Sequence, residues 1–194
     1  GGFDEEKLKA VAQHPEVKMF EIKLSQGAKP GKGGILPGAK VSKEIAEIRG
    51  LTVGQDAISP NRHPEINHVD DLLDMINYIR TTTGKPVGFK AVVGATSFFD
   101  NLFAAINERG RESAPDFMTI DSADGGSGAA PMSLIDNMGL PLKESLPLVV
   151  DLLKKHGLRE RVKVIASGKL IVPSKVAWAL ALGADFIVSA RGHM

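Results

Sequence analysis

The chain has 194 residues, 43% of them hydrophobic, and its 24 basic and 23 acidic residues leave a net charge of +1. This length predicts one domain with a sizeable core, and the charge balance gives no electrostatic basis for binding nucleic acid or a membrane surface. The absence of cysteine excludes disulfides, thiolate metal sites and cysteine nucleophiles within the chain, and it fits a cytoplasmic location. No apolar run reaches the ~18 residues that span a bilayer.

Short apolar runs alternate along the chain with longer amphipathic segments. The runs predict strands at 19–24, 53–58, 87–93, 117–121, 162–166 and 186–189. The amphipathic segments predict helices at 3–13, 69–82, 98–109, 142–156 and 173–182. This alternation indicates a parallel sheet with right-handed crossovers. Because a complete (β/α)8 barrel typically needs ~250 residues, the pattern fits either a barrel with parts missing or an open doubly wound sheet.

Glycine-bearing loops follow three successive strands at the end of the chain. They are Asp124-Gly125-Gly126, Ser167-Gly168-Lys169 and Ala190-Arg191-Gly192. One such loop indicates only a tight turn. Three in succession predict a phosphate site, because ligands of parallel α/β folds bind at the carboxyl ends of the strands. There, glycine lets backbone N–H groups approach a phosphate and arginine can grip it.

Two lysines lie inside predicted strands. Lys23 faces opposite to Ile22 and Leu24, so it points either into a barrel mouth or, by snorkelling, into solvent at the strand end. Lys90 lies similarly in a later strand. The functional interpretation of both is a cation beside a flavin ring. Arg49 ends a helical stretch, and its type and place fit a solvated arginine as well as a ligand contact.

The histidines and serines match no known catalytic or metal-ligand spacing. His63 and His68 flank a loop without forming an HExxH-like set, and no G-x-S-x-G elbow occurs. The sequence therefore predicts no metal site and gives little support to acyl transfer.

Beyond these patterns, the sequence resembles the FMN-binding central domain of the glutamate synthase family. The run Glu21-Ile22-Lys23-Leu24-Ser25-Gln26-Gly27-Ala28-Lys29-Pro30-Gly31-Lys32-Gly33-Gly34 is similar to the hallmark loop of that domain. The similarity continues in order through Arg49, Ile58-Ser59-Pro60, Gly88-Phe89-Lys90, the run from Asp121 to Pro131, Ala166-Ser167-Gly168-Lys169 and Ser189-Ala190-Arg191-Gly192. The resemblance identifies residues 1–194 as one partial FMN-binding (β/α)8 TIM-barrel domain, truncated at both ends and holding about six βα units.

The resemblance implies FMN as cofactor and a glutamate synthase-type oxidoreductase acting on CH–NH2 donors. Members of the family reduce 2-iminoglutarate, formed from 2-oxoglutarate and ammonia, to L-glutamate. By position, Lys23 and Gln26 would contact the flavin, Lys23 and Lys29 would be catalytic, and Lys29 and Arg49 would hold the substrate carboxylates. The other cofactor-binding residues that the resemblance implies are Lys90, Asp121, Gly125, Gly126, Ser167, Gly168, Ala190 and Arg191.

The resemblance also implies partners outside this chain. These are the missing barrel segments, an amidotransferase that frees ammonia from glutamine, electron-donor subunits or domains, and a 3Fe–4S cluster whose cysteine ligands this chain lacks. Other functions stay open: another FMN-dependent barrel oxidoreductase, such as a 2-hydroxyacid oxidase with His193 as its only candidate late-strand histidine, or an isopentenyl-diphosphate isomerase-like enzyme. A non-catalytic structural fragment is the third reading.

Overall fold

The computed structural model describes residues 3–25, 34–58, 60, 62–124, 133–134 and 137–190. In this part of the chain, five strands form one parallel sheet in the order β1-β4-β5-β6-β7. The strands are β1 (Phe20–Lys23), β4 (Val87–Val92), β5 (Phe117–Asp121), β6 (Lys163–Ser167) and β7 (Phe186–Val188). The order follows the chain, as in a (β/α) barrel.

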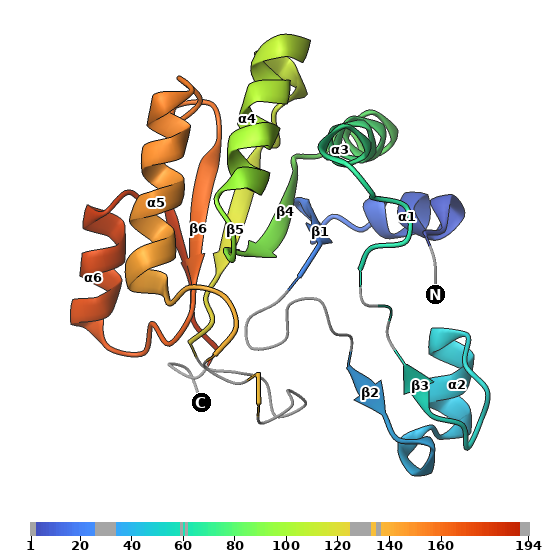
Figure 1. Cartoon of the computed structure of the whole chain (residues 1–194). Helices are drawn as coiled ribbons and strands as arrows, with labels where there is room; N and C mark the ends of the chain where they lie inside the picture. The colour runs from blue at the N-terminus through green and yellow to red at the C-terminus, as the bar shows by residue number, and fades with distance from the viewer. Residues whose placement is uncertain are drawn as a thin grey trace.

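Helices cover one face of this sheet (Figure 1). They are α3 (Val69–Thr83), α4 (Ser97–Arg109), α5 (Leu142–Lys155) and α6 (Pro173–Ala181), with α1 (Glu5–Ala12) packed beside α3 and the short η2 (Arg111–Ser113) after α4. A doubly wound sheet carries helices on both faces, whereas a barrel carries them outside only. The structure therefore confirms the predicted incomplete barrel.

The core lies between the sheet and these helices. Ile22, Phe89, Met118 and Val164 stand side by side across four strands, and all four are buried. From the helix side, α3 contributes Leu72, Leu73, Ile76 and Ile79 at helical spacing, and α4 and α5 contribute similar stripes. The alternate residues of each strand face the other way, so the sheet has a buried outer face and an inner face on which no helix lies in the described part of the chain.

The predicted strand at 53–58 forms outside the parallel sheet. Of residues 53–58, only β3 (Ala57–Ile58) is extended, and it pairs antiparallel with β2 (Ile35–Leu36). Between them lie η1 (Gly38–Lys40) and α2 (Lys43–Arg49), and the turn before β3 is tied back because Asp56 Oδ1 accepts the Gly38 N–H at 2.6 Å. Figure 1 shows β2, β3 and α2 apart from the sheet. The parallel sheet thus has five strands in the described residues, not six.

Aspartates fasten the end of the sheet at which the strands begin, called here the amino edge. Asp116 lies just before β5 and accepts Arg80 Nε at 3.0 Å, Arg161 Nη2 at 3.0 Å and the Val87 N–H at 2.8 Å. These residues form the Asp116 clasp. Both arginines also donate to the Ala114 carbonyl. The carboxylate therefore holds the starts of β4 and β5 together with the end of α3.

Asp185, just before β7, makes a second clasp of the same kind. Its carboxylate accepts the Val164 N–H at 2.7 Å and Arg159 Nη2 at 3.0 Å. Arg159 donates further to the carbonyl oxygens of Val162 and Gly183. The amino edge is thus fastened at two points by partly buried charge pairs with hydrogen bonds to the backbone.

Three rows of side chains follow one another along the inner face. The first row, at the amino edge, holds Phe117, whose ring lies against Gly88 of the neighbouring strand. A Cβ at Gly88 would overlap both the ring and the carbonyl oxygen of Phe117, so only glycine fits there. Phe117 is 5% exposed although no helix of the described residues covers this face. No helix among the described residues has the length and apolar character to cross a bilayer.

Candidate active site at the carboxyl edge

Polar side chains gather on the inner face toward the end at which the strands finish, the carboxyl edge. Lys23 of β1 and Lys90 of β4 are directly paired in register, and Lys90 is paired with Thr119 of β5. One row further, Asp121 of β5 is paired with Ser167 of β6. Strand alternation and parallel register therefore bring Lys23, Lys90, Asp121 and Ser167, four of the residues predicted from the sequence, to one face.

Hydrogen bonds and an ion pair link this group across the strands. Ser167 Oγ donates to Asp121 Oδ1 at 2.9 Å. Glu21, which the sequence analysis did not single out, places its Oε1 3.5 Å from Lys90 Nζ, and its Oε2 accepts the Thr119 hydroxyl at 2.5 Å. Thr119 is only 3% exposed. The site thus combines two cations with two carboxylates, and each carboxylate accepts a hydrogen bond from a side chain on another strand.

The loops after β5 and β6 are held together by the backbone and by Asp124. The Ser122 N–H donates to the Ser167 carbonyl at 2.9 Å. Asp124 Oδ2 accepts the Ser122 hydroxyl at 2.7 Å and the Leu142 N–H at 2.9 Å. Because Leu142 is the first residue of α5, Asp124 caps that helix and fixes the point at which the chain leaves β5.

The loop after β6 turns sharply. Gly168 has a φ of 144° and Lys169 a φ of 43°, both in the region that disfavours ordinary side chains. A Cβ at Gly168 would overlap the Cβ of Ser122. Beyond the turn, the Leu170 carbonyl accepts the Ser189 hydroxyl at 2.7 Å. The loops after β6 and β7, which the sequence assigned to a phosphate, therefore lie next to each other.

Other predicted site residues lie elsewhere or outside the described residues. Ala190 follows β7 and is exposed at this edge. Arg49 is the exposed last residue of α2, in the segment that stands apart from the sheet, so the structure does not bring it to the lysines. Outside the described residues lie Gln26, Lys29, Gly125, Gly126, Arg191 and His193. Their predicted roles stay predictions.

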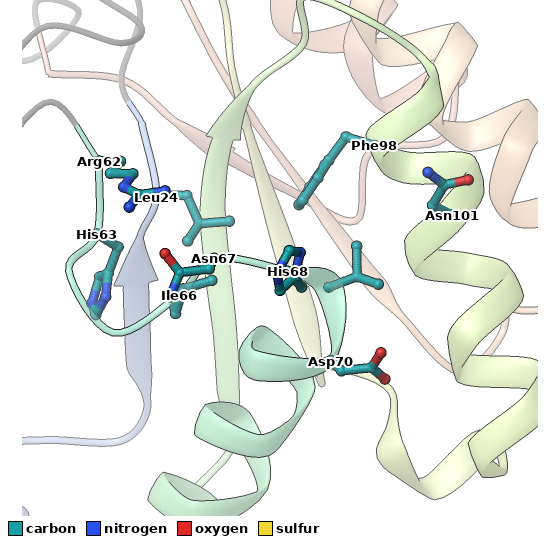
Figure 2. A pocket seen from close by; sticks show the side chains of 10 residues that line it. Leu24, Arg62, His63, Ile66, Asn67, His68, Asp70, Phe98 and Asn101 are labelled. Atoms are coloured by element: carbon teal, nitrogen blue, oxygen red, sulfur yellow. The ribbon is translucent and has the colours of Figure 1, made fainter.

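A cavity of about 600 Å³ opens where β1 ends, beside Leu24. Figure 2 shows Arg62 and His63 on the loop leading to α3, with Asn67 and His68 where that helix begins. From the opposite side α4 contributes Phe98 and Asn101. Sequence reasoning set both histidines aside because they lacked metal spacing. Their position in the sequence, immediately before the predicted helix at 69–82, is the pattern that could have indicated them.

The acidic groups near this cavity already have partners. Asp70 Oδ1 lies 3.1 Å from Arg109 Nη1. Asp71 accepts the N–H groups of Asn67 and His68 at 2.8 and 3.0 Å, and these bonds hold the pKa of its carboxyl below the ordinary value. The carboxylates are therefore engaged, and Arg62, His68 and the two asparagines present cationic or polar groups to the cavity. No cluster of three or more His, Asp or Glu suited to a metal ion occurs in the described ranges.

Sequence comparisons give one consistent result. A family model described as a conserved region in glutamate synthase matches residues 11–194. The glutamate synthase large subunit-like protein YerD of Bacillus subtilis is 46% identical over 100% of this chain and 36% of its own length. An archaeal glutamate synthase [NADPH] of Methanocaldococcus jannaschii is 38% identical over 87% of this chain and 32% of its own length. The chain thus spans about a third of each of these relatives.

Solved structures match at the level of the fold. An A198G:L230A mutant flavocytochrome b2 with pyruvate bound superposes with a TM-score of 0.56 at 15% identity, over 97% of this chain and 39% of that one. DHODH of Eimeria tenella in complex with ferulenol gives a TM-score of 0.55 at 13% identity, over 97% of this chain and 47% of that one. At these identities the likeness concerns the backbone alone, and it agrees with the incomplete barrel.

Proposed function

The chain belongs to the glutamate synthase family, and from this premise we propose that it is the FMN-binding part of an oxidoreductase that makes L-glutamate. The proposed substrate is 2-iminoglutarate, formed from 2-oxoglutarate and ammonia. One observation carries the proposal: two lysines in register, Lys23 and Lys90, stand on the inner face of a parallel sheet at its carboxyl edge. That edge is where barrel enzymes bind their ligands.

The residues present fit FMN at both ends of that molecule. Its phosphate suits the adjacent loops after β6 and β7, where Gly168 allows close approach of the backbone. Its ring suits the lysine row, because cations stabilise negative charge on a reduced flavin. When bound, FMN supplies the hydride that reduces the substrate carbon. Among the residues with a predicted role, Asp121 and Ser167 offer a hydrogen-bonded pair between these two ends.

The chain's own residues would orient the ligands and hold charge. Lys23 and Lys90 would place positive charge toward the flavin ring. Asp124, by capping α5, would hold the start of the loop that carries Gly125 and Gly126. The rigid sheet beneath supports this geometry, since sites built on strands are more precise than sites on loops alone.

The substrate carboxylates need cations, and the proposal assigns them to the same edge. Lys29 and Arg49 keep the role implied by the resemblance. Arg49 would reach the substrate only with residues 34–58 packed against the carboxyl edge. The cavity beside Leu24 supports a dicarboxylate nearby, because its wall offers Arg62 and His68 while the neighbouring carboxylates already have partners.

The proposal includes further parts outside this chain. Remaining barrel strands, a source of ammonia such as an amidotransferase, and an electron donor would come from a longer polypeptide or from partners, in keeping with relatives about three times as long. Any cysteine ligands of an iron–sulfur cluster would also lie outside, since the chain has no cysteine. A cytoplasmic location is part of the same proposal.

The test uses the full-length protein that contains this chain. We expect a flavin absorption band in the purified protein, release of FMN on denaturation, and L-glutamate formation from 2-oxoglutarate and ammonium chloride with dithionite as reductant. Failure to contain or take up FMN would overturn the proposal. A flavoprotein that forms no glutamate under these conditions would overturn the substrate assignment and leave another FMN-dependent oxidoreductase.

A further inference from the structure

One contact on the inner face spans three strands and has no role in the proposed chemistry so far. Glu21 of β1 reaches across β4 to Thr119 of β5, and on the way it meets Lys90. We propose that Glu21 is a positioning residue that sets where the Lys90 ammonium sits, and thereby the electrostatic field at the flavin. This inference rests on the proposed function, because it takes Lys90 to face the FMN ring.

The register explains how a β1 side chain reaches a strand two places away. Glu21 is paired with Gly88, and Lys90 lies one row nearer the carboxyl edge. Because Gly88 has no side chain, nothing on β4 stands between Glu21 and β5 in that row. The Phe117 ring fills the space over Gly88 and permits no Cβ there, and the Glu21 carboxylate ends at the next row, where it meets Lys90 and Thr119.

Both carboxylate oxygens of Glu21 are engaged. Oε2 accepts the Thr119 hydroxyl at 2.5 Å, and Oε1 lies 3.5 Å from Lys90 Nζ. Thr119 is almost fully buried, so its hydroxyl holds the carboxylate in one place rather than exchanging with water. The fixed carboxylate then attracts the ammonium toward the Glu21 row, away from the carboxyl edge. Lys90 and Glu21 are each about a quarter to a third exposed, so water weakens this pair only partly.

The sign of the effect follows from charge. A cation near the flavin favours its reduced, negatively charged form, so it makes the midpoint potential more positive. Glu21 draws Lys90 away and balances its charge, which makes the potential more negative than Lys90 alone would. Loss of the carboxylate therefore shifts the potential in the positive direction. A residue that merely tied the strands together would change stability without changing the potential.

The experiment measures the midpoint potential of FMN bound to the full-length protein, with the thermal midpoint recorded for every variant. We expect a positive shift in E21Q and a smaller positive shift in T119V, which keeps the carboxylate but removes its anchor. T119S, which keeps the hydroxyl, is the matched control and should match the wild type. In a K90M background, E21Q should produce at most half of its original shift, because its effect is exerted through Lys90.

Several results would contradict this inference. No shift in E21Q and T119V would reduce Glu21 to a structural role. An undiminished E21Q shift in the K90M background would mean that the carboxylate acts through its own field. A wild-type protein that binds no FMN would overturn the proposed function instead. Crystal structures of E21Q and T119V then decide the inference, since Lys90 Nζ should move toward the carboxyl edge and an unmoved Nζ would overturn it.

Discussion

The two edges of the parallel sheet are built from the same five strands with opposite chemistry. At the amino edge, Asp116 and Asp185 each pair with arginine and also accept a backbone N–H from the adjoining strand. At the carboxyl edge stand lysines in register and a turn with positive φ at Gly168 and Lys169. At the amino edge the two aspartates are bonded to the backbone and to arginines of the fold, whereas at the carboxyl edge Lys23 and Lys90 stand on the inner face of the sheet.

This difference shows how one fold separates stability from ligand binding. The clasps hold strand ends and helix ends in place, so the opposite edge can carry cations and strained turns without losing its geometry. Barrel folds generally keep stabilising contacts at the amino end and chemistry at the carboxyl end. A variant at one edge that changes the property assigned to the other edge would contradict this separation.

The largest expected effect is at the Asp116 clasp. Asp116→Ala leaves Arg80, Arg161 and the Val87 N–H without their acceptor, and we expect a loss of about 3 kcal/mol in the free energy of unfolding. Urea unfolding of the full-length protein, followed by circular dichroism, measures this. FMN affinity of the folded fraction should stay near that of the wild type. A stable variant with lost FMN binding would contradict the division between the edges.

Gly168→Ala comes next. The added Cβ has an unfavourable φ and overlaps Ser122, which together should cost about 2 kcal/mol and weaken FMN binding. Gly157→Ala is the matched control, because Gly157 has a φ of 69° and open space around it, so it carries only the backbone cost. Fluorescence titration with FMN and urea unfolding compare the two. Equal losses of FMN affinity would remove Gly168 from the proposed phosphate loop.

Asp124→Ala tests how much stability the carboxyl edge itself contributes. The change removes the cap of α5 and should cost about 1 kcal/mol, less than the loss of a clasp. Asp124→Asn retains an acceptor and should recover part of this loss. Urea unfolding provides the values. A loss of stability larger than that of Asp116→Ala would mean that the carboxyl edge, not the amino edge, contributes more to holding the sheet together.

The smallest expected effect comes from the helix layer, where Asp100 bonds to His156 Nε2 at 2.8 Å and to Lys155 Nζ at 3.0 Å. The hydrogen bond to His156, and next in size the one to Lys155, hold the pKa of the Asp100 carboxyl below its ordinary value of 3.8. The contact therefore stabilises the fold above about pH 4, and this contribution disappears as pH falls through the lowered pKa. Thermal midpoints of the wild type and Asp100→Asn should differ slightly at pH 5 and converge toward pH 2. A difference that persists at pH 2 would exclude this explanation.

Much of the fold followed from the sequence because its periodicities are strong. Leu72, Leu73, Ile76 and Ile79 marked α3, and the alternation around Lys23 and Lys90 gave the facing of both strands. The segment at 53–58 was harder, because its strand is two residues long and its position depends on the Asp56 contact with Gly38. Short pairs held by one side chain leave almost no periodic signal.

The sequence predicted the site residues that lie singly in or after a strand. It did not predict the contacts that depend on which strands are neighbours and in what register. Lys23 and Lys90 were found separately, but their direct register and the bridge through Glu21 need the strand order. The capping of α5 by Asp124 joins positions 18 residues apart, and no local sequence pattern indicates it. The cavity lined by His63 and His68 required the meeting of a loop with α3 and α4.

The packing of Phe117 against Gly88 affects the routes by which water and protons can reach the site. Phe117 occupies the row beneath Lys90 and Thr119, and it is nearly inaccessible although no helix among the residues described lies on the inner face. Its ring closes the inner face beneath these two side chains, whereas Lys163 in the same row is half exposed. Water and protons would therefore reach Lys90 and Thr119 from the carboxyl edge or across the open inner face, rather than past Phe117.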